Sequence, residues 1–135
     1  MSELLTIDQF IFTTLRDDAA IAAAVAARIY AEISPSGTTY PCITFARLSG
    51  GDVNGIGPVR IATKAVYLIQ AIGESGYAAI DSIVNRIDTL LHGTHKELTG
   101  GTIVSCLREQ PFSQVDTDEG RVFYRRGGIY RIMVH

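Results

Sequence analysis

The sequence is poor in charged residues and has no excess of either sign. Asp, Glu, Lys and Arg make up 19% of its 135 residues, and twelve basic against fourteen acidic side chains give a net charge of −2. A typical domain carries about 25% charged residues. This balance argues against a protein that coats nucleic acid through bulk charge or lies on an anionic membrane. Apolar residues reach 47%, so the chain is rather hydrophobic for a small monomer and is expected to associate.

Long hydrophobic runs are also missing. There is no stretch of about 18 apolar residues, and no basic segment followed by an apolar run opens the chain. We therefore expect no membrane-spanning helix and no secretory signal peptide. The length suits one domain, residues 1–135, which can bury roughly two thirds of its unfolded surface without metals or disulfides.

Cysteine is scarce. Cys42 and Cys106 lie far apart and outside any C-x-x-C pair, so zinc binding and thioredoxin-like chemistry are unsupported. Both fall in segments with strand patterns, and we interpret them as small buried apolar side chains in a reducing compartment. A disulfide between neighbouring strands is the alternative.

The N-terminal region has helical signals. Thr6 and Gln9 have the spacing of a capping box, and apolar residues follow on one face. Asp17 and Asp18 precede the alanine-rich run 19–27, and acidic residues suit the positive end of a helix. We expect two consecutive helices here.

Strand patterns follow. Residues 28–30 and 42–48 predict short strands, and 60–72 predicts a long one. Because the long strand is apolar on both faces, we expect a helix to cover one face and another element to cover the other. Residues 50–58 contain four glycines, which argues for a loop between the strands.

The clearest pattern predicts an amphipathic helix over residues 75–91. Ser75 can cap its start, and Gly93 lies just past its end. The apolar residues recur at helical spacing and define one face, which we expect to lie on the sheet. They are Ile80, Ile83, Val84, Ile87, Leu90 and Leu91.

The last third predicts a hairpin of strands 102–115 and 121–135 around an acidic turn, with Val115 opposite Val122. This pairing sets residues 110 and 111 opposite 127 and 126, so both strands should be irregular there. A hairpin tip at Gly127-Gly128 is the rival. We favour the long hairpin because it leaves no strand unpaired. The fold class is then α+β: a small, mostly antiparallel sheet of about four or five strands, with an N-terminal helical region and one amphipathic helix packed against it.

Motifs for catalysis or cofactors are weak. The segment from Gly55 to Pro58 resembles a dinucleotide fingerprint only superficially, because proline removes an amide that would hold phosphate. His92 and His95 have H-x-x-H spacing with only Glu97 nearby, and a metal site needs a third well-placed ligand. We interpret them as part of a solvated loop. We predict no enzymatic activity, no catalytic residues, no cofactor and no metal.

Two further segments have a functional and a structural interpretation. Asp116-x-Asp118-x-Gly120 opens like a calcium loop but lacks the final bidentate glutamate, so an acidic solvated turn is favoured. The last strand combines arginines with tyrosines and could contact nucleic acid. The favoured interpretation is that these arginines pair with acidic groups across the sheet or a subunit interface. They are Arg125, Arg126 and Arg131, beside Tyr124 and Tyr130.

Several short motifs, taken in order, resemble the tail-completion proteins of long-tailed phages, also called tail terminators or tail-to-head joining proteins. The resemblance covers essentially the whole chain in element order. The motifs are Ala27-Arg28-Ile29-Tyr30, Tyr40-Pro41-Cys42-Ile43-Thr44-Phe45, a glycine-rich loop, Leu90-Leu91-His92-Gly93, Tyr124-Arg125-Arg126 and Tyr130-Arg131.

The resemblance implies a structural virion protein that caps the finished tail tube as a ring, usually of six subunits, and joins it to the head. The implied partners are other copies of the chain, the tail tube protein and the neck protein, with passing contact with genomic DNA in the lumen and none with a membrane. The implied location is the head-proximal end of the tail, after a period in the host cytoplasm.

Two other roles stay open. One is a head-closure connector of the neck, and the other is a small enzyme or a metal- or ligand-binding module around His92 and His95. The candidate partner-contacting residues lie in the two predicted loops and the last strand. They are Gly50, Gly51, Asp52, Asn54, Gly57, Asp116, Asp118, Glu119, Arg125 and Arg126.

Overall fold

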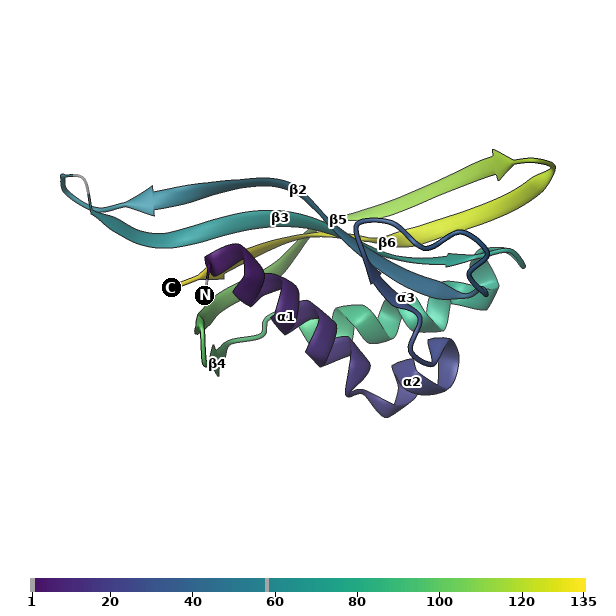
Figure 1. Ribbon diagram of the computed structural model, residues 1–135, viewed down its shortest axis with the longest axis horizontal. Coiled ribbons are helices and arrows are strands. Elements are labelled where there is room, and N and C mark those ends of the chain that lie inside the picture. Colours follow the sequence, from purple (N-terminus) through teal and green to yellow (C-terminus); the bar gives the residue numbers. More distant parts are fainter. Residues whose placement is uncertain (1, 58) are drawn as a thin grey trace.

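A six-stranded sheet carries three helices on one face in the computed structural model, which describes residues 2–57 and 59–135 (Figure 1). The helices and strands follow one another as α1 (Glu3–Arg16), α2 (Ala19–Val25), β1 (Ile29–Ala31), β2 (Cys42–Asn54), β3 (Arg60–Gly73), α3 (Tyr77–Leu91), β4 (Lys96–Leu98), β5 (Gly101–Asp118) and β6 (Arg121–Val134). The predicted α+β class is confirmed, with a larger sheet than the four or five strands expected.

The strands lie in the order β1-β2-β3-β6-β5-β4. β1 runs parallel to β2, and every other neighbouring pair is antiparallel. No sequence pattern predicts β4, because its three residues show no apolar alternation. Only its pairing with Gly101–Ile103 of β5 defines it as a strand. It is the element that raises the strand number above the expected range.

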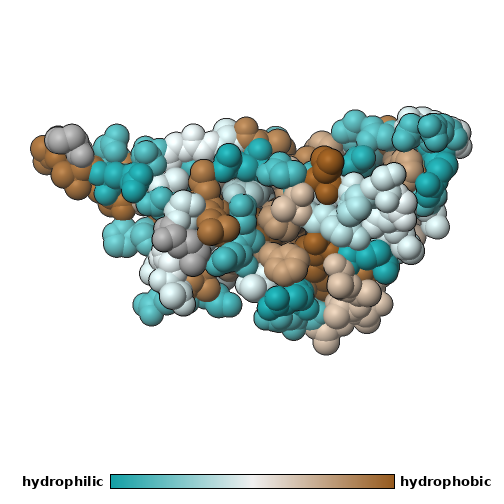
Figure 2. Space-filling view, viewed as in Figure 1, coloured by the Kyte–Doolittle hydropathy of each residue, from teal (hydrophilic) through white to brown (hydrophobic). Residues whose placement is uncertain are grey.

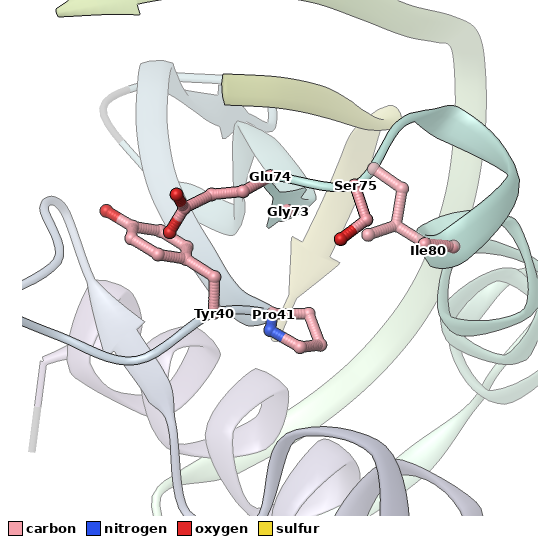
Figure 3. A pocket seen from close by; sticks show the side chains of 7 residues that line it. Tyr40, Pro41, Gly73, Glu74, Ser75 and Ile80 are labelled. Carbon is pink, nitrogen blue, oxygen red and sulfur yellow. The ribbon is translucent and has the colours of Figure 1, made fainter. Parts of the chain in front are cut away.

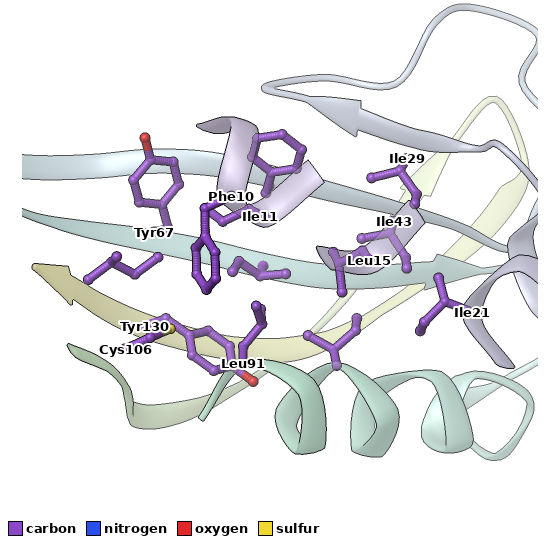
Figure 4. Close-up of a cluster of buried hydrophobic side chains, with 14 of the residues drawn as sticks. Phe10, Ile11, Leu15, Ile21, Ile29, Ile43, Tyr67, Leu91, Cys106 and Tyr130 are labelled. Atoms are coloured by element: carbon purple, nitrogen blue, oxygen red, sulfur yellow. The ribbon is translucent and has the colours of Figure 1, made fainter. Parts of the chain in front are cut away.

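The core lies between the helices and the covered face of the sheet (Figure 4). The predicted apolar stripe of α3 is buried, with the exception of the half-buried Leu90. Ala65, Tyr67, Ile69 and Ala71 of β3 contribute to the sheet side of this core, together with buried residues of the neighbouring strands. Burial of these apolar surfaces, at roughly 25 cal/mol per Å², is the main force that holds the two layers together.

The three helices differ in how their N-terminal ends are capped, and two of them begin at other residues than predicted. Ser2 caps α1 by accepting a bond from the Leu5 amide (3.2 Å), so the helix begins before Thr6. Thr6 is buried inside the first turn and donates to the Ser2 carbonyl. Asp18 caps α2 as its position suggested. α3 begins after Gly76, which offers no side-chain cap, and not at Ser75.

The predicted glycine-rich loop is mostly strand, which corrects the prediction for residues 50–58. β2 continues through Gly50, Gly51 and Asp52 to Asn54, paired with β3 from Ala65 to Arg60. A β-bulge between Arg47 and Ser49 lets the pairing resume after a change of register. Glycine weakens a strand but does not forbid one, and the long partner strand supplies the ladder. Pro58 lies outside the described residues.

The long hairpin of β5 and β6 is confirmed, but its predicted register is wrong by two residues. Val122 pairs with Thr117, and Val115 pairs with Tyr124. The turn is only Glu119-Gly120, both with positive φ (49° and 78°), as a tight two-residue hairpin requires. The acidic residues before it therefore belong to β5. β5 has a bulge between Arg108 and Gln110, near the level where irregularity was expected, but Pro111 pairs in register with Gly128 and β6 itself is regular there.

Gly127 and Gly128 lie inside β6 and not at a hairpin tip. A Cβ atom at Gly127 would lie 2.0 Å from the Ile69 carbonyl oxygen and 2.6 Å from the Gln70 Cα. Both contacts are with backbone atoms of β3, which cannot move without opening the ladder. The absence of a side chain here lets the two central strands pair closely.

We predict that Gly127→Ala lowers the free energy of unfolding by about 2 kcal/mol or more, because the added methyl group overlaps the backbone of β3. Gly51→Ala is the matched control, since no atom lies within 4 Å of its Cβ position, and it should change stability by less than about 0.5 kcal/mol. Urea titration of both variants measures the difference. Equal stability of the two would contradict the packing described.

The two cysteines are free and fully buried, which supports the interpretation as apolar side chains over the disulfide. Burial raises the pKa of the Cys42 thiol to about 11 and that of Cys106 to about 12. Native protein at pH 8 should therefore resist thiol reagents, and both cysteines should react after unfolding. Labelling followed by mass measurement checks this, and rapid labelling of the native chain would contradict it.

The raised thiol pKa values also set a pH dependence. Thiols of the unfolded chain ionise near pH 8.5, whereas the native thiols stay protonated until about pH 11. Between these values the unfolded state binds fewer protons, so the contribution of the thiols to stability falls as the pH rises. Urea midpoints measured between pH 7 and pH 10 should decrease, and less so in a Cys42→Ala variant once its lower starting stability is subtracted.

Candidate functional site

Two hairpin arms extend past the helices at opposite ends of the sheet (Figure 1). We call residues 47–66, the outer parts of β2 and β3, the first arm. Residues 109–129, the outer parts of β5 and β6, form the second arm. Most of the side chains in each arm are exposed. The outer part of each arm is a two-stranded ladder, whereas residues 63–66 of β3 pair also with β6, and residues 124–129 of β6 pair also with β3.

The ten predicted contact residues divide between these arms and do not converge on one site. Gly50, Gly51, Asp52 and Asn54 lie in β2, and Gly57 lies in the turn of the first arm. The remaining five lie in the second arm. Asp116 and Asp118 belong to β5, Glu119 to the turn, and Arg125 and Arg126 to β6.

The tip of the first arm is apolar, which sequence reasoning missed. Ile56 is fully exposed, and Val59 and Ile61 are more than half exposed. Figure 2 shows this end of the molecule as hydrophobic. The available signal was a set of large apolar residues in and next to a glycine-rich segment, where no core could bury them. Exposed side chains of this kind, gathered at one point, mark a contact site.

The tip of the second arm is acidic. Asp118 and Glu119 are exposed, and neither has an ion-pair partner among the described residues. Asp116 instead pairs with Arg125 across the ladder and accepts a hydrogen bond from Gln114. The two arms therefore differ in character at their ends: one is apolar and the other negative.

Arg125 and Arg126 point to opposite faces of the sheet, and both are held within the chain. Arg125 pairs with Asp116 on the face away from the helices. The Arg126 guanidinium lies 3.9 Å from the centre of the Tyr77 ring and 3.7 Å from a carboxylate oxygen of Asp81, both on α3. These contacts favour the structural interpretation of the arginine-rich strand over a nucleic-acid surface.

The face of the sheet away from the helices is only partly covered. Tyr40, in the segment before β2, packs on Phe123 with ring centres 5.1 Å apart and closes one end, where Cys42 and Ile72 are buried. Val66 and Leu68 of β3 remain half-exposed. The second apolar face of this strand thus lacks the full cover that its sequence predicted.

A pocket of about 260 Å³ lies between the segment before β2 and the start of α3 (Figure 3). Its polar lining includes Ser75 and Glu74, and the Glu74 carboxylate is held by Arg121. The figure shows the Tyr40 ring next to Glu74 and the Pro41 ring facing the Ser75 side. We find no nucleophile paired with a base among the residues that line it.

The two histidines do not converge on a site. His92 Nδ1 accepts a hydrogen bond from the Arg108 amide (2.9 Å), which ties the end of α3 to β5. His95 Nδ1 lies 3.4 Å from the Val104 carbonyl oxygen. Within residues 2–57 and 59–135, no group of three or more His, Cys, Asp or Glu is placed to hold a metal ion. In the same residues, no helix has the length and apolar character needed to span a membrane.

Arg126→Ala should lower the free energy of unfolding by about 1 kcal/mol, because the stacked guanidinium joins the second arm to α3. Arg131→Ala is the control, since its pair with Glu109 (3.1 Å) is exposed and should contribute less than about 0.5 kcal/mol. Urea unfolding followed by circular dichroism measures both. A larger loss in the control would show that Arg126 does not join the two layers.

Comparison with known proteins supports one family. The family model described as "Tail completion protein gp17" matches residues 9–134. A chain in a solved structure titled "Virion of native gene transfer agent (GTA) particle" is similar in fold, with a TM-score of 0.71 over 92% of this chain and 90% of that chain, at 16% identity. No curated protein matches. The family match covers nearly the whole sequence, so this chain belongs to the tail completion protein family, whose members are structural proteins of phage tails.

Proposed function

We propose that this protein caps the phage tail tube as a ring of identical subunits and forms the joint between tail and head. The observation that carries the proposal is family membership over residues 9–134, together with surfaces that the single chain leaves uncovered. The protein would act through contacts between subunits and partners, without a cofactor and without catalysis.

The shape of the subunit suits a ring. A closed ring requires two different patches on each subunit, one that meets the preceding copy and one that meets the next. The two arms provide such patches, because they lie at opposite ends of the sheet and differ in chemistry. A ring of about six copies, as the family resemblance implies, would place equivalent arms at regular intervals around a central lumen.

The uncovered apolar surface gives association a driving force. A standard interface buries about 800 Å² on each partner. Four residues of the first arm contribute exposed apolar area of the kind that such an interface removes from water: Leu48, Ile56, Val59 and Ile61. Hydrogen bonds and ion pairs at the rim would then select the correct partner.

The remaining partners follow from the same proposal. One surface of the ring would meet the tail tube protein and the other the neck protein, while genomic DNA passes through the lumen. Arg125 and Arg126 are engaged within the chain, so contact with DNA would depend on other groups. Under this proposal the protein would lie at the head-proximal end of the tail in the virion, and in the host cytoplasm before assembly.

Removal of the gene from the phage tests the function directly. Electron microscopy of the mutant lysate should reveal tubes of uncontrolled length and filled heads without tails, because no cap would stop tube growth or dock the head. Supplying the wild-type protein in trans should restore tails of normal length. Normal joined particles in its absence would contradict the proposal.

A second assay distinguishes the cap from a head-closure connector. Purified protein is mixed separately with isolated tail tubes and with heads that carry the portal complex, and binding is measured by sedimentation. Binding to tubes supports the cap, whereas binding to portal-bearing heads without tubes would favour the connector.

A further inference from the structure

The two outer strands of the sheet, β1 and β4, are short, so long edges of their neighbours β2 and β5 remain unpaired. β1 pairs with β2 only at Ile43–Phe45, so residues 47–54 of β2 have no neighbour on that side among the described residues. β4 pairs with β5 only at Gly101–Ile103, and two further bonds join Cys106 to Gly93 and Arg108 to His92. Residues 109–118 of β5 then form a second open edge. An exposed strand edge is a template for pairing with another chain.

The ladder pattern identifies which backbone groups face outward. The amide of Ile43 and the carbonyl of Phe45 bond toward β1, and bonding alternates along each strand. Beyond the bulge this leaves Gly50 and Asp52 with outward amides and carbonyls. On β5, the Cys106 carbonyl and the Arg108 amide face outward, and the alternation continues through Pro111 to Ser113 and Val115.

Proline fits its place on this edge. Pro111 has no amide hydrogen, and its alternation position directs that missing donor away from β6. The ladder within the chain is therefore intact. Four outward residues of the two edges, Gly50 and Asp52 on one side and Ser113 and Val115 on the other, retain donors and acceptors.

We propose that β2 of one copy pairs with β5 of the next copy through these edges, in antiparallel orientation, so that the sheets join head to tail around the ring. This interface rests on the ring proposed above. The occupant of each edge is a second copy of this chain, because every copy carries both edges at opposite ends and one repeated contact closes a ring.

The chemistry of the arms supports this choice and sets a register. In an antiparallel overlap the base of the first arm meets the tip of the second. Counted from Gly50 opposite Val115 and across the bulge of β2, Arg47, an exposed cation without an ion-pair partner in the described chain, then lies opposite Thr117, next to the acidic tip of Asp118 and Glu119. Opposite charges therefore lie near each other at this end of the contact.

The same register brings outward groups together. Gly50 faces Val115 and Asp52 faces Ser113, which are the residues that the alternation leaves free to bond. Between them, Gly51 faces Gln114 in a non-hydrogen-bonded pair, on the same face of the joined sheet. Such pairs bring Cα atoms to about 4.5 Å, within the range that a disulfide spans.

Cysteine cross-linking tests the interface. We expect a Gly51→Cys, Gln114→Cys double variant to form a ladder of disulfide-linked oligomers on mild oxidation, in pure oligomer and in assembled tails. The native thiols are buried and should not contribute. Each single variant should remain unlinked, and a Gly51→Cys, Ser82→Cys pair is the control, since Ser82 is exposed on α3.

The outcomes separate this interface from the function on which it rests. A ring visible at the tail end by electron microscopy, with no more cross-linking than in the Ser82 control, would overturn the edge pairing alone. Absence of a ring at the tail end would overturn both. A short bismaleimide reagent, used in parallel, removes the strict geometry of the disulfide as a cause of failure.

A charge exchange provides a second test. Arg47→Glu should weaken association by about tenfold, because it sets like charges against Asp118 and Glu119. Adding Asp118→Arg and Glu119→Arg to the same chain should restore it, as each copy then carries the reversed pair. Sedimentation velocity measures the oligomer, and thermal melting of each variant verifies the fold. Failure of the triple variant to recover while it remains folded would contradict the register.

Discussion

Two tyrosines at the centre of the sheet tie it to both long helices. Tyr67 of β3 and Tyr130 of β6 lie opposite each other, and both are almost fully buried. The Tyr67 hydroxyl donates to Asp8 of α1 (2.6 Å), and the Tyr130 hydroxyl donates to Asp88 of α3 (3.0 Å). Burial and these carboxylates raise the pKa of both phenols, so they remain donors throughout the neutral range. Each ring thus adds apolar area to the core while its polar end fixes one helix.

This arrangement determines which parts of the sheet stay free. A strand residue advances about 3.3 Å, whereas a helix residue advances about 1.5 Å. The longest strand, β5 (Gly101–Asp118), is therefore much longer than α3 (Tyr77–Leu91), which packs against the sheet. The excess length becomes the two arms, which are held by their own ladders and by a few ion pairs. Association with partners is the natural means of covering them, and a tail component in a phage particle has such partners.

The charges follow the same division. Most arginines are paired within the chain, as Arg86 is with Asp18 and Arg121 with Glu74. The first of these joins α3 to the start of α2, and the second joins β6 to the segment before α3. The groups that remain without a partner in the described residues include Arg47 and the acidic tip of the second arm. A sequence with few charges thus places some of its uncompensated ones on the surfaces proposed for assembly.

The sequence by itself determined the elements whose patterns repeat locally. The helical spacing from Ile80 to Leu91 predicted α3, and the long apolar run predicted β3, because side-chain periodicity depends only on neighbouring residues. It also placed the candidate contact residues in the segments that became the arms. The order of short motifs also carried the family resemblance, which the family match over residues 9–134 confirms.

Only the tertiary structure decided the pairing of distant segments. The sequence around Gly50 and Gly51 predicts a loop. Both residues lie in a strand because they pair with β3, and their local sequence does not reveal this pairing. The hairpin register at Val115 shifted by two residues since two positive-φ residues, Glu119 and Gly120, suffice for the turn. The apolar tip and the open strand edges also depend on where the helices end relative to the sheet. The pairing, the register and the open edges arise from contacts between residues far apart in the chain, which no local pattern encodes, whereas the apolar residues of the tip lie together in the sequence.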